Sequence, residues 1–134
     1  MADTKIFVKS SKKSFSKWEI WDFGQAASRA NSEHQQPLDP NKPNRRFLII
    51  SDNALLKNAH SDTKILRHPI GENQINTLFA VPLIAGQAGC TKNCFIWCHE
   101  IYTLKAKYFY KKYGSAESVS DKIKLNQKIL LDLR

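Results

Sequence analysis

The sequence predicts a mainly β fold, a small antiparallel barrel that ends in an amphipathic helix. Short apolar or alternating segments recur along the chain, each bounded by turn-forming residues. A helical pattern stands out only near the C-terminus, whereas a parallel sheet needs a crossover helix between strands. With 134 residues and 42% hydrophobic content, the chain can build one compact core but not two. We expect a single domain over residues 18–134, preceded by a basic arm at 1–17.

The first two strands are expected at residues 18–23 and 46–51. In the first, WEIWDF, Trp18 and Ile20 fall on one face of an alternating pattern that Gly24 ends. The second contains FLIIS, a continuous run rich in β-branched residues, which is typical of a buried strand. Both segments are therefore interpreted as strands of one sheet.

The middle of the chain predicts a short helical turn and two more strands. The turn is expected within residues 54–62, and a strand at 64–70 should end near Pro69. A further strand at 77–86 contains Pro82. Because proline cannot donate a ladder hydrogen bond, this strand is expected at a sheet edge, or Pro82 at a strand end.

Residues 94–104 alternate throughout and are expected to form one continuous strand. Cys94 and Cys98, together with Cys90 and His99, are possible zinc ligands. Zinc sites, however, pair ligands at a turn with a distant second pair, and this spacing follows a strand pattern instead. We interpret the cysteines as reduced core thiols and expect neither a metal nor a cofactor.

An amphipathic helix is expected after Gly114, which should begin a new element. Ser118 and Asp121 have the spacing of a capping box with the shorter acid. One helical face carries the apolar residues Val119, Ile123, Leu130 and Leu133.

The connection from Gly24 to Arg46 is long, polar and rich in Pro, Asn, Gln and Ser. Compact domains seldom contain such long loops unless the loop binds or reacts with something. This loop supplies two acid/base candidates and three cations, namely Glu33, His34, Arg29, Arg45 and Arg46.

The formal net charge of +9 is concentrated at the two ends of the chain. Residues 1–17 and 101–134 are strongly basic, whereas 18–100 are balanced. Such ends suit a polyanionic partner, although simple solubilising charge is the alternative. No apolar run approaches the roughly 20 residues that span a bilayer, and the N-terminus lacks a signal-peptide pattern. A cytoplasmic location without membrane contact is therefore expected.

Phosphate-binding Gly-rich loops, HExxH and GxSxG are absent from the sequence. A metal-free ribonuclease instead needs a base for the ribose 2′-OH, an acid for the leaving oxygen and a cation for the phosphorane. The candidates for these roles are Glu33 or His34, His99, and Arg45 or Arg46. Solvated loop side chains and a hydrogen-bonded strand histidine are the alternative interpretation.

Several fragments resemble the MazF/PemK family of toxin endoribonucleases from bacterial toxin–antitoxin modules. WEIWDFG resembles the family's opening segment, and SEHQQ resembles its loop Glu-Gln pair. RRFLIIS is similar to "RPVLVIS", AVPLIAG to "VVPLTS", and CHEIYTLK to "CDQIRTID". The match runs from about Trp18 to Leu133, with the fragments in the family's order.

The resemblance implies an SH3-like barrel of the CcdB/MazF/PemK type. It also implies a homodimer that cleaves single-stranded RNA without metal and is neutralised by an antitoxin with an acidic tail. The family's catalytic arginine falls on Arg45, with Arg46 as the alternative. We expect catalytic roles for Arg45, His99, Glu33 and His34, and RNA contacts from Arg46, Arg29, Trp97 and Lys105.

The sequence departs from the family at several places. Ile84 and Ala85 stand where a Thr or Ser is usual, and Trp97 and Tyr102 replace two arginines. His99 replaces an Asp, and Arg46 replaces the Pro that follows the catalytic arginine. A catalytically silent member that binds RNA or an antitoxin is therefore the alternative. A gyrase inhibitor of the CcdB type is a third possibility, but that activity depends on a Trp-Gly-Ile C-terminus and this chain ends in LDLR.

Overall fold

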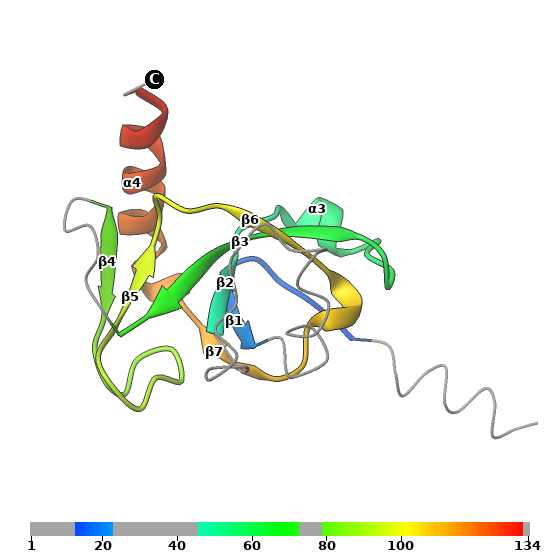
Figure 1. Cartoon of the computed structure of the whole chain (residues 1–134), viewed down its shortest axis with the longest axis horizontal. Coiled ribbons are helices and arrows are strands. Elements are labelled where there is room, and N and C mark those ends of the chain that lie inside the picture. The colour runs from blue at the N-terminus through cyan, green and yellow to red at the C-terminus, as the bar shows by residue number, and fades with distance from the viewer. Residues whose placement is uncertain (1–12, 23–45, 73–78, 133–134) are drawn as a thin grey trace, which may run out of the picture.

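The computed structural model describes residues 13–22, 46–72 and 79–132, and every structural feature below belongs to these ranges. Most of the regular elements in the described chain are strands, and one longer helix closes it (Figure 1). The elements in order are β1 Glu19–Asp22, β2 Arg46–Ile49, α3 Asn53–Leu56, β3 Lys64–Gly71, β4 Ala80–Leu83, β5 Cys94–Trp97, β6 Tyr102–Lys105, η2 Ala106–Tyr108, β7 Lys112–Ser115, η3 Glu117–Val119 and α4 Ser120–Asp132.

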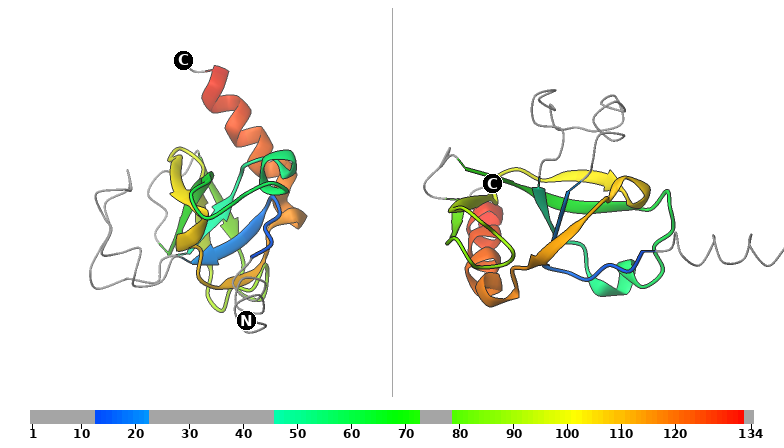
Figure 2. Two further views of the ribbon diagram at one scale, coloured as in Figure 1. Left: turned by 90° about the vertical axis from the view of Figure 1, so that its right-hand side faces the viewer. Right: turned by 90° about the horizontal axis from the view of Figure 1, so that it is seen from below.

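The strands form one curled sheet in the order β4-β5-β3-β2-β1-β7, with β6 also paired to β3. Each of these pairings is antiparallel. Two further views show the sheet curving around, with α4 packed outside it beside β4 and β5 (Figure 2). The predicted mainly β, antiparallel fold with a C-terminal helix is confirmed. Within the described ranges, no helix is long and apolar enough to cross a membrane.

The long strand β3 changes partners along its length. It pairs with β6 up to Arg67 and with β5 from Ile70 onward, while β2 lies along its middle. Pro69 lies between the residues that pair with β6 and those that pair with β5, so its missing amide hydrogen interrupts neither of these two ladders. The strand was expected at residues 64–70, and it is observed at Lys64–Gly71, one residue longer.

Both faces of the sheet are buried, each against its own apolar cluster. Ile20 and Leu48 lie in one cluster, which α4 covers with Ile123. Trp21 and Phe47 lie in the other, so the alternation predicted for the first strand is confirmed. The first cluster also holds the three sulfur atoms of Cys90, Cys94 and Cys98, which confirms their interpretation as core thiols.

The described part of the basic arm is docked against the apolar cluster that contains Trp21 and Phe47. The ring of Phe15 lies 5.1 Å from that of Trp21 and 4.8 Å from that of Phe109, measured between centroids. The side chain of Lys13 donates to the carbonyl of Phe109. Residues 13–17 are therefore packed on the barrel, and residues 1–12 lie outside the described residues.

The single strand expected at residues 94–104 is two strands joined by a turn. The Glu100 amide donates to the carbonyl of Trp97 at 3.2 Å, which closes this turn and redirects the chain from β5 to β6. The alternation in the sequence continues through these turn residues, so the sequence pattern did not indicate the turn. His99 consequently lies in a turn and not in a strand.

Two details near the C-terminal helix also differ from expectation. Gly114 does not begin an element but lies inside β7, opposite Ile20 of β1. Ser118 lies within η3, and it is Ser115 whose hydroxyl accepts from an amide at this entrance, that of Glu117. The capping box was therefore wrong. The apolar face was right at Val119, Ile123 and Leu130, and Leu133 lies outside the described residues.

Candidate functional site

The predicted loop leaves and rejoins the sheet at two paired residues. Asp22, the last residue of β1, lies opposite Arg46, the first residue of β2. Residues 23–45 connect these two positions and lie outside the described residues. The predicted site residues within that segment are Arg29, Glu33, His34 and Arg45, so their places in the fold are not described.

Tyr113 of β7 brings together the groups at the base of this loop. Its hydroxyl donates to Oδ2 of Asp22 at 2.6 Å. The guanidinium carbon of Arg46 lies 3.8 Å from the centre of its ring, and Nζ of Lys111 lies 5.2 Å from it. We call Asp22, Arg46, Lys111 and Tyr113 the tyrosine cluster.

A β-bulge turns Tyr113 toward this cluster. Ile20 pairs with Gly114 and Trp21 pairs with Lys112, so Tyr113 is the extra residue on the β7 side. A bulge bends its strand and redirects the side chain of the inserted residue. Tyr113 thereby reaches Asp22, although the two residues lie on different strands.

The β4–β5 connection supports the cluster from the other side. Nη1 of Arg46 donates to the carbonyl of Gly89 at 3.3 Å. Gly89 has φ +78°, and a Cβ on it would lie 2.1 Å from the carbonyl oxygen of Tyr113. Only glycine meets both requirements without displacing the backbone.

The electrostatics keep Tyr113 a neutral phenol. Its burial, followed by the hydrogen bond and negative charge of Asp22, raises its pKa, and Arg46 opposes this shift. Asp22 is only 1% exposed. Among the residues that the structure describes, its Oδ1 atom has no hydrogen-bond partner. Among the described residues, Tyr113 thus supplies the side-chain hydrogen bond to this buried carboxylate.

A second cluster lies at the turn between β5 and β6. Nε2 of His99 is 3.3 Å from Oε2 of Glu100, and the hydroxyl of Tyr102 donates to Oε1 of the same carboxylate at 2.7 Å. The side chains of His99 and Glu100 are 20% and 27% exposed. We call these three residues the histidine cluster; an imidazole held by a carboxylate is a suitable group for moving protons.

His68 ties this turn to the C-terminal helix. Its Nδ1 atom lies 2.8 Å from the carbonyl oxygen of Glu100, so Nδ1 donates the hydrogen. Nε2 then accepts from the side-chain amide of Gln127 at 3.0 Å. Burial lowers the pKa of His68, and the neighbouring His99 lowers it further against the opposing effect of the Glu100 hydrogen bond. The folded protein therefore holds His68 neutral.

Arg67 is a buried cation next to the histidine cluster. It is 1% exposed, and its guanidinium carbon lies 5.3 Å from the ring centre of Phe47 and 5.5 Å from that of Tyr102. Phe47 is a core residue of β2, and Tyr102 belongs to the histidine cluster. A buried, permanently charged side chain thus lies beside one member of the histidine cluster.

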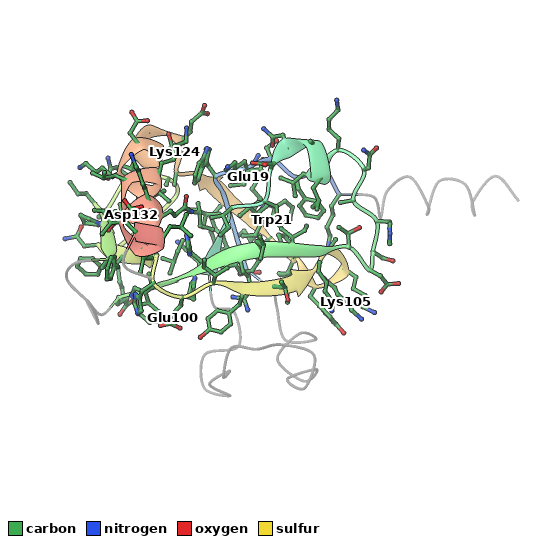
Figure 3. All side chains as sticks on the ribbon, turned by 90° about the horizontal axis from the view of Figure 1, so that it is seen from above. Glu19, Trp21, Glu100, Lys105, Lys124 and Asp132 are labelled. Carbon is green, nitrogen blue, oxygen red and sulfur yellow. The ribbon has the colours of Figure 1, made fainter. Side chains whose placement is uncertain are left out.

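The remaining predicted contacts are placed less favourably. Trp97 is 5% exposed, and a Cβ on Gly71 would lie 2.3 Å from its ring, so its face is not presented for stacking on a base. Glu100 and Lys105 lie toward opposite ends of β6, so Lys105 is not next to the histidine cluster (Figure 3). Ile84, at the position of the family's hydroxyl, is 62% exposed.

The sequence interpretation missed Asp22, Lys111 and Tyr113. A bulge and a contact between distant strands produce their grouping, and neither leaves a local pattern. No set of three or more His, Cys, Asp or Glu side chains in ranges 13–22, 46–72 and 79–132 is arranged to hold a metal ion.

Comparison with known proteins identifies the class of fold. No protein-family model and no curated protein matches the sequence. Among solved structures, the chain is similar to one described as an endoribonuclease in complex with its cognate antitoxin from Mycobacterial species. The TM-score is 0.65 at 13% identity, and the match covers 90% of this chain and 98% of that one. The chain therefore shares the fold of that structure.

Proposed function

We propose that this chain is a toxin-like endoribonuclease of the MazF/PemK type, which cleaves single-stranded RNA without a metal ion. The observation that carries the proposal is the likeness, over 90% of the chain, to an endoribonuclease solved with its antitoxin. The two clusters supply groups that such a reaction needs.

The tyrosine cluster is the proposed contact to the RNA backbone. A guanidinium stacked on an aromatic ring keeps its in-plane N–H groups directed outward, which suits bidentate binding of a phosphate. Arg46 has this arrangement over Tyr113, and the exposed Lys111 adds a second cation beside the same ring. The net charge of +9 favours association with a polyanion by releasing bound counterions.

The histidine cluster is the proposed source of acid/base catalysis. His99 is the proposed group that exchanges protons with the substrate; Glu100 lies 3.3 Å from its Nε2 atom, and Tyr102 donates a hydrogen bond that fixes the orientation of Glu100. The ribose 2′-oxygen attacks phosphorus, and Arg45 or Arg46 stabilises the phosphorane. The products are a 2′,3′-cyclic phosphate and a 5′-hydroxyl. Glu33 and His34 remain proposed participants from the loop.

The proposed partners follow from the same comparison and from the charge. The similar solved protein is held by its cognate antitoxin, and a segment with an acidic tail would complement a chain of net charge +9. We further propose a homodimer that acts in the cytoplasm.

A catalytically silent RNA- or antitoxin-binding protein is the second candidate. It is favoured by the exposed apolar Ile84 at the position of the family's hydroxyl, and by Trp97, which is buried where the family has a cation. In that case the tyrosine cluster would bind RNA, and the histidine cluster would serve to hold the β5–β6 turn.

Purified full-length protein, incubated with a panel of single-stranded RNAs in a metal chelator, distinguishes the two candidates. Wild-type protein should cleave, and His99→Ala should bind RNA but lose cleavage. His60→Ala is the matched control because His60 is exposed and lies in the separate turn after α3. RNA binding without cleavage by the wild type selects the silent RNA-binding protein. Absence of both RNA binding and cleavage contradicts the endoribonuclease and leaves only an antitoxin-binding protein.

A further inference from the structure

Two of the three cysteines are in direct contact. The sulfur atoms of Cys90 and Cys94 lie 3.3 Å apart, and both cysteines are free and buried, with 4% and 8% exposed. Cys98 is also free and 0% exposed, but its sulfur has no such contact with another described thiol. The neighbouring pair therefore differs in its geometry from the third thiol.

Cys90 belongs to a tight turn that contacts the tyrosine cluster. Its carbonyl accepts from the amide of Gly86 at 2.7 Å, and its amide donates to the carbonyl of Gln87 at 2.8 Å. The preceding residue, Gly89, accepts the hydrogen bond from Arg46 and packs against the backbone of Tyr113. A movement of Cys90 is thus transmitted through one peptide unit to Arg46 and Tyr113.

We propose that Cys90 and Cys94 form an oxidative modification site, at which a reversible disulfide alters the tyrosine cluster and weakens its binding of RNA. The effect on RNA rests on the proposed function, whereas formation of the disulfide does not. The two sulfur atoms must approach from 3.3 Å to about 2.05 Å, the length of a disulfide bond. This shift has to be absorbed by the turn or by the start of β5.

Hydrogen peroxide is an oxidant small enough for buried thiols. Burial, together with its hydrogen bond with Cys90, raises the pKa of Cys94 to about 12, so Cys94 stays a thiol. The Cys90 sulfur attacks one peroxide oxygen, the O–O bond breaks, and a sulfenic acid and one water form. The Cys94 sulfur then attacks the Cys90 sulfur, and the hydroxyl leaves as a second water with the Cys94 proton. Two thiols are oxidised and one peroxide is reduced.

The turn has little space to move without disturbing the cluster. Gly89 fits so closely against Tyr113 that an added Cβ would lie 2.1 Å from its carbonyl oxygen, and Gly114 fits against Ala88 in the same way, at 2.7 Å. The Arg46 bond to Gly89 is already long at 3.3 Å. Disulfide formation is therefore expected to break that bond and to leave Arg46 less well oriented for phosphate.

The first test follows the thiols of the full-length protein. After treatment with hydrogen peroxide, denaturation and alkylation, the wild type should have lost the mass of two hydrogen atoms, with one thiol left to alkylate, that of Cys98. Trypsin cuts after Lys92, between Cys90 and Cys94, so the oxidised protein should yield two peptides joined by the disulfide. Three alkylated thiols, or a disulfide that includes Cys98, would overturn the proposal, and this result needs only the wild-type protein.

Matched variants repeat the measurement. Cys90→Ala and Cys94→Ala should not form the bond, and Cys98→Ala should still form it. Cys98 is the matched control because it is also buried and its pKa is likewise raised to about 12 by burial. Loss of the bond in Cys98→Ala, or its survival in Cys94→Ala, counts against the assigned pair.

The second test compares reduced and oxidised wild type. Oxidation should reduce the affinity for a single-stranded RNA and change hydrogen exchange at the amides of Gly86 and Cys90, and dithiothreitol should reverse both effects. A disulfide that forms but leaves RNA affinity unchanged overturns the regulatory part. Absence of RNA binding in both forms contradicts the proposed function, whereas the thiol measurement and the exchange measurement still decide the modification site.

Discussion

The hydroxyl of Tyr113 donates a 2.6 Å hydrogen bond to Asp22 across a separation of 91 positions in the chain. Asp22 ends β1 where the long loop begins, and Tyr113 is the bulge residue of β7. This bond joins the base of the loop to the C-terminal half of the molecule. The RNA contact proposed at Arg46 depends on it, because the ring it orients is the one on which the guanidinium lies.

Replacing Tyr113 by Phe should destabilise the fold by about 1–3 kcal/mol, the usual cost of leaving a buried polar group without its partner. The Asp22 carboxylate would lose the hydrogen bond that Tyr113 donates and has little contact with water. Urea denaturation measures the change. Tyr110→Phe is the control: because Tyr110 is 68% exposed, removing its hydroxyl should leave the free energy of unfolding nearly unchanged. Equal stabilities of the two variants would contradict the importance of this bond.

Replacing Arg46 by Lys should reduce RNA affinity although the charge is retained, because an ammonium group can neither stack flat on Tyr113 nor bind phosphate in a bidentate way. Arg46→Ala should bind more weakly still and lower the slope of log K against log salt by about 0.7, as expected for one lost contact to single-stranded phosphate. Lys57→Ala, an exposed position just after α3, is the charge control. If it lowers affinity as much as Arg46→Ala, binding depends on overall charge and not on this cluster.

Stability should fall as the solution becomes acidic below about pH 6.5, the usual pKa of histidine. The pKa of His68 is lowered in the folded state, chiefly by burial. Between 6.5 and that lower value, the unfolded chain binds a proton that the folded chain does not, so the slope for this group reaches about 1.4 kcal/mol per pH unit. Urea midpoints measured across this range, with the His68 ring signal followed by NMR, test the sign. A ring that titrates above pH 6.5 in the folded protein would contradict the assignment.

Gly89→Ala should cost about 1–3 kcal/mol through backbone strain alone, and should also lower RNA affinity, because its Cβ would collide with the carbonyl of Tyr113. Gly86→Ala separates the two effects. Gly86 also has a positive φ, of +97°, but an added Cβ would meet nothing within 4 Å. Thermal unfolding should therefore show strain in both variants, and RNA binding should fall in Gly89→Ala. Equal RNA affinities would contradict the tight fit of Gly89 as a support of the cluster.

Short-range patterns predicted most of the fold. Alternation placed Ile20 and Trp21 on opposite faces of β1, and Pro82 correctly indicated the edge strand β4. The helical spacing of Val119 and Ile123 identified the face of the C-terminal helix that packs on the core. In β1 and in the C-terminal helix, burial of a periodic apolar face decides the local structure, and the period is visible in the sequence. For β4, the missing amide hydrogen of Pro82 is the signal.

The missed features depend on contacts between distant segments. The turn that separates β5 from β6 interrupts an unbroken alternation, and β7 is paired although Lys112 and Gly114 give it no apolar pattern. Trp97 was expected to contact RNA, but tertiary packing against Gly71 buries it. Among the predicted site residues, the structure shows His99 beside Glu100 and Arg46 beside Tyr113. The roles predicted for the loop residues remain predictions.

Cleavage of a matched pair of RNAs tests the central claim most directly. One RNA has ribose throughout, and the other carries a single 2′-deoxyribose at the nucleotide before the cleaved bond. In the presence of a metal chelator, the wild-type protein should cut the first to a 2′,3′-cyclic phosphate and leave the second intact, because the 2′-oxygen is the proposed nucleophile. Cutting of the deoxy-substituted RNA at the same bond, or no cutting of either, would contradict the account.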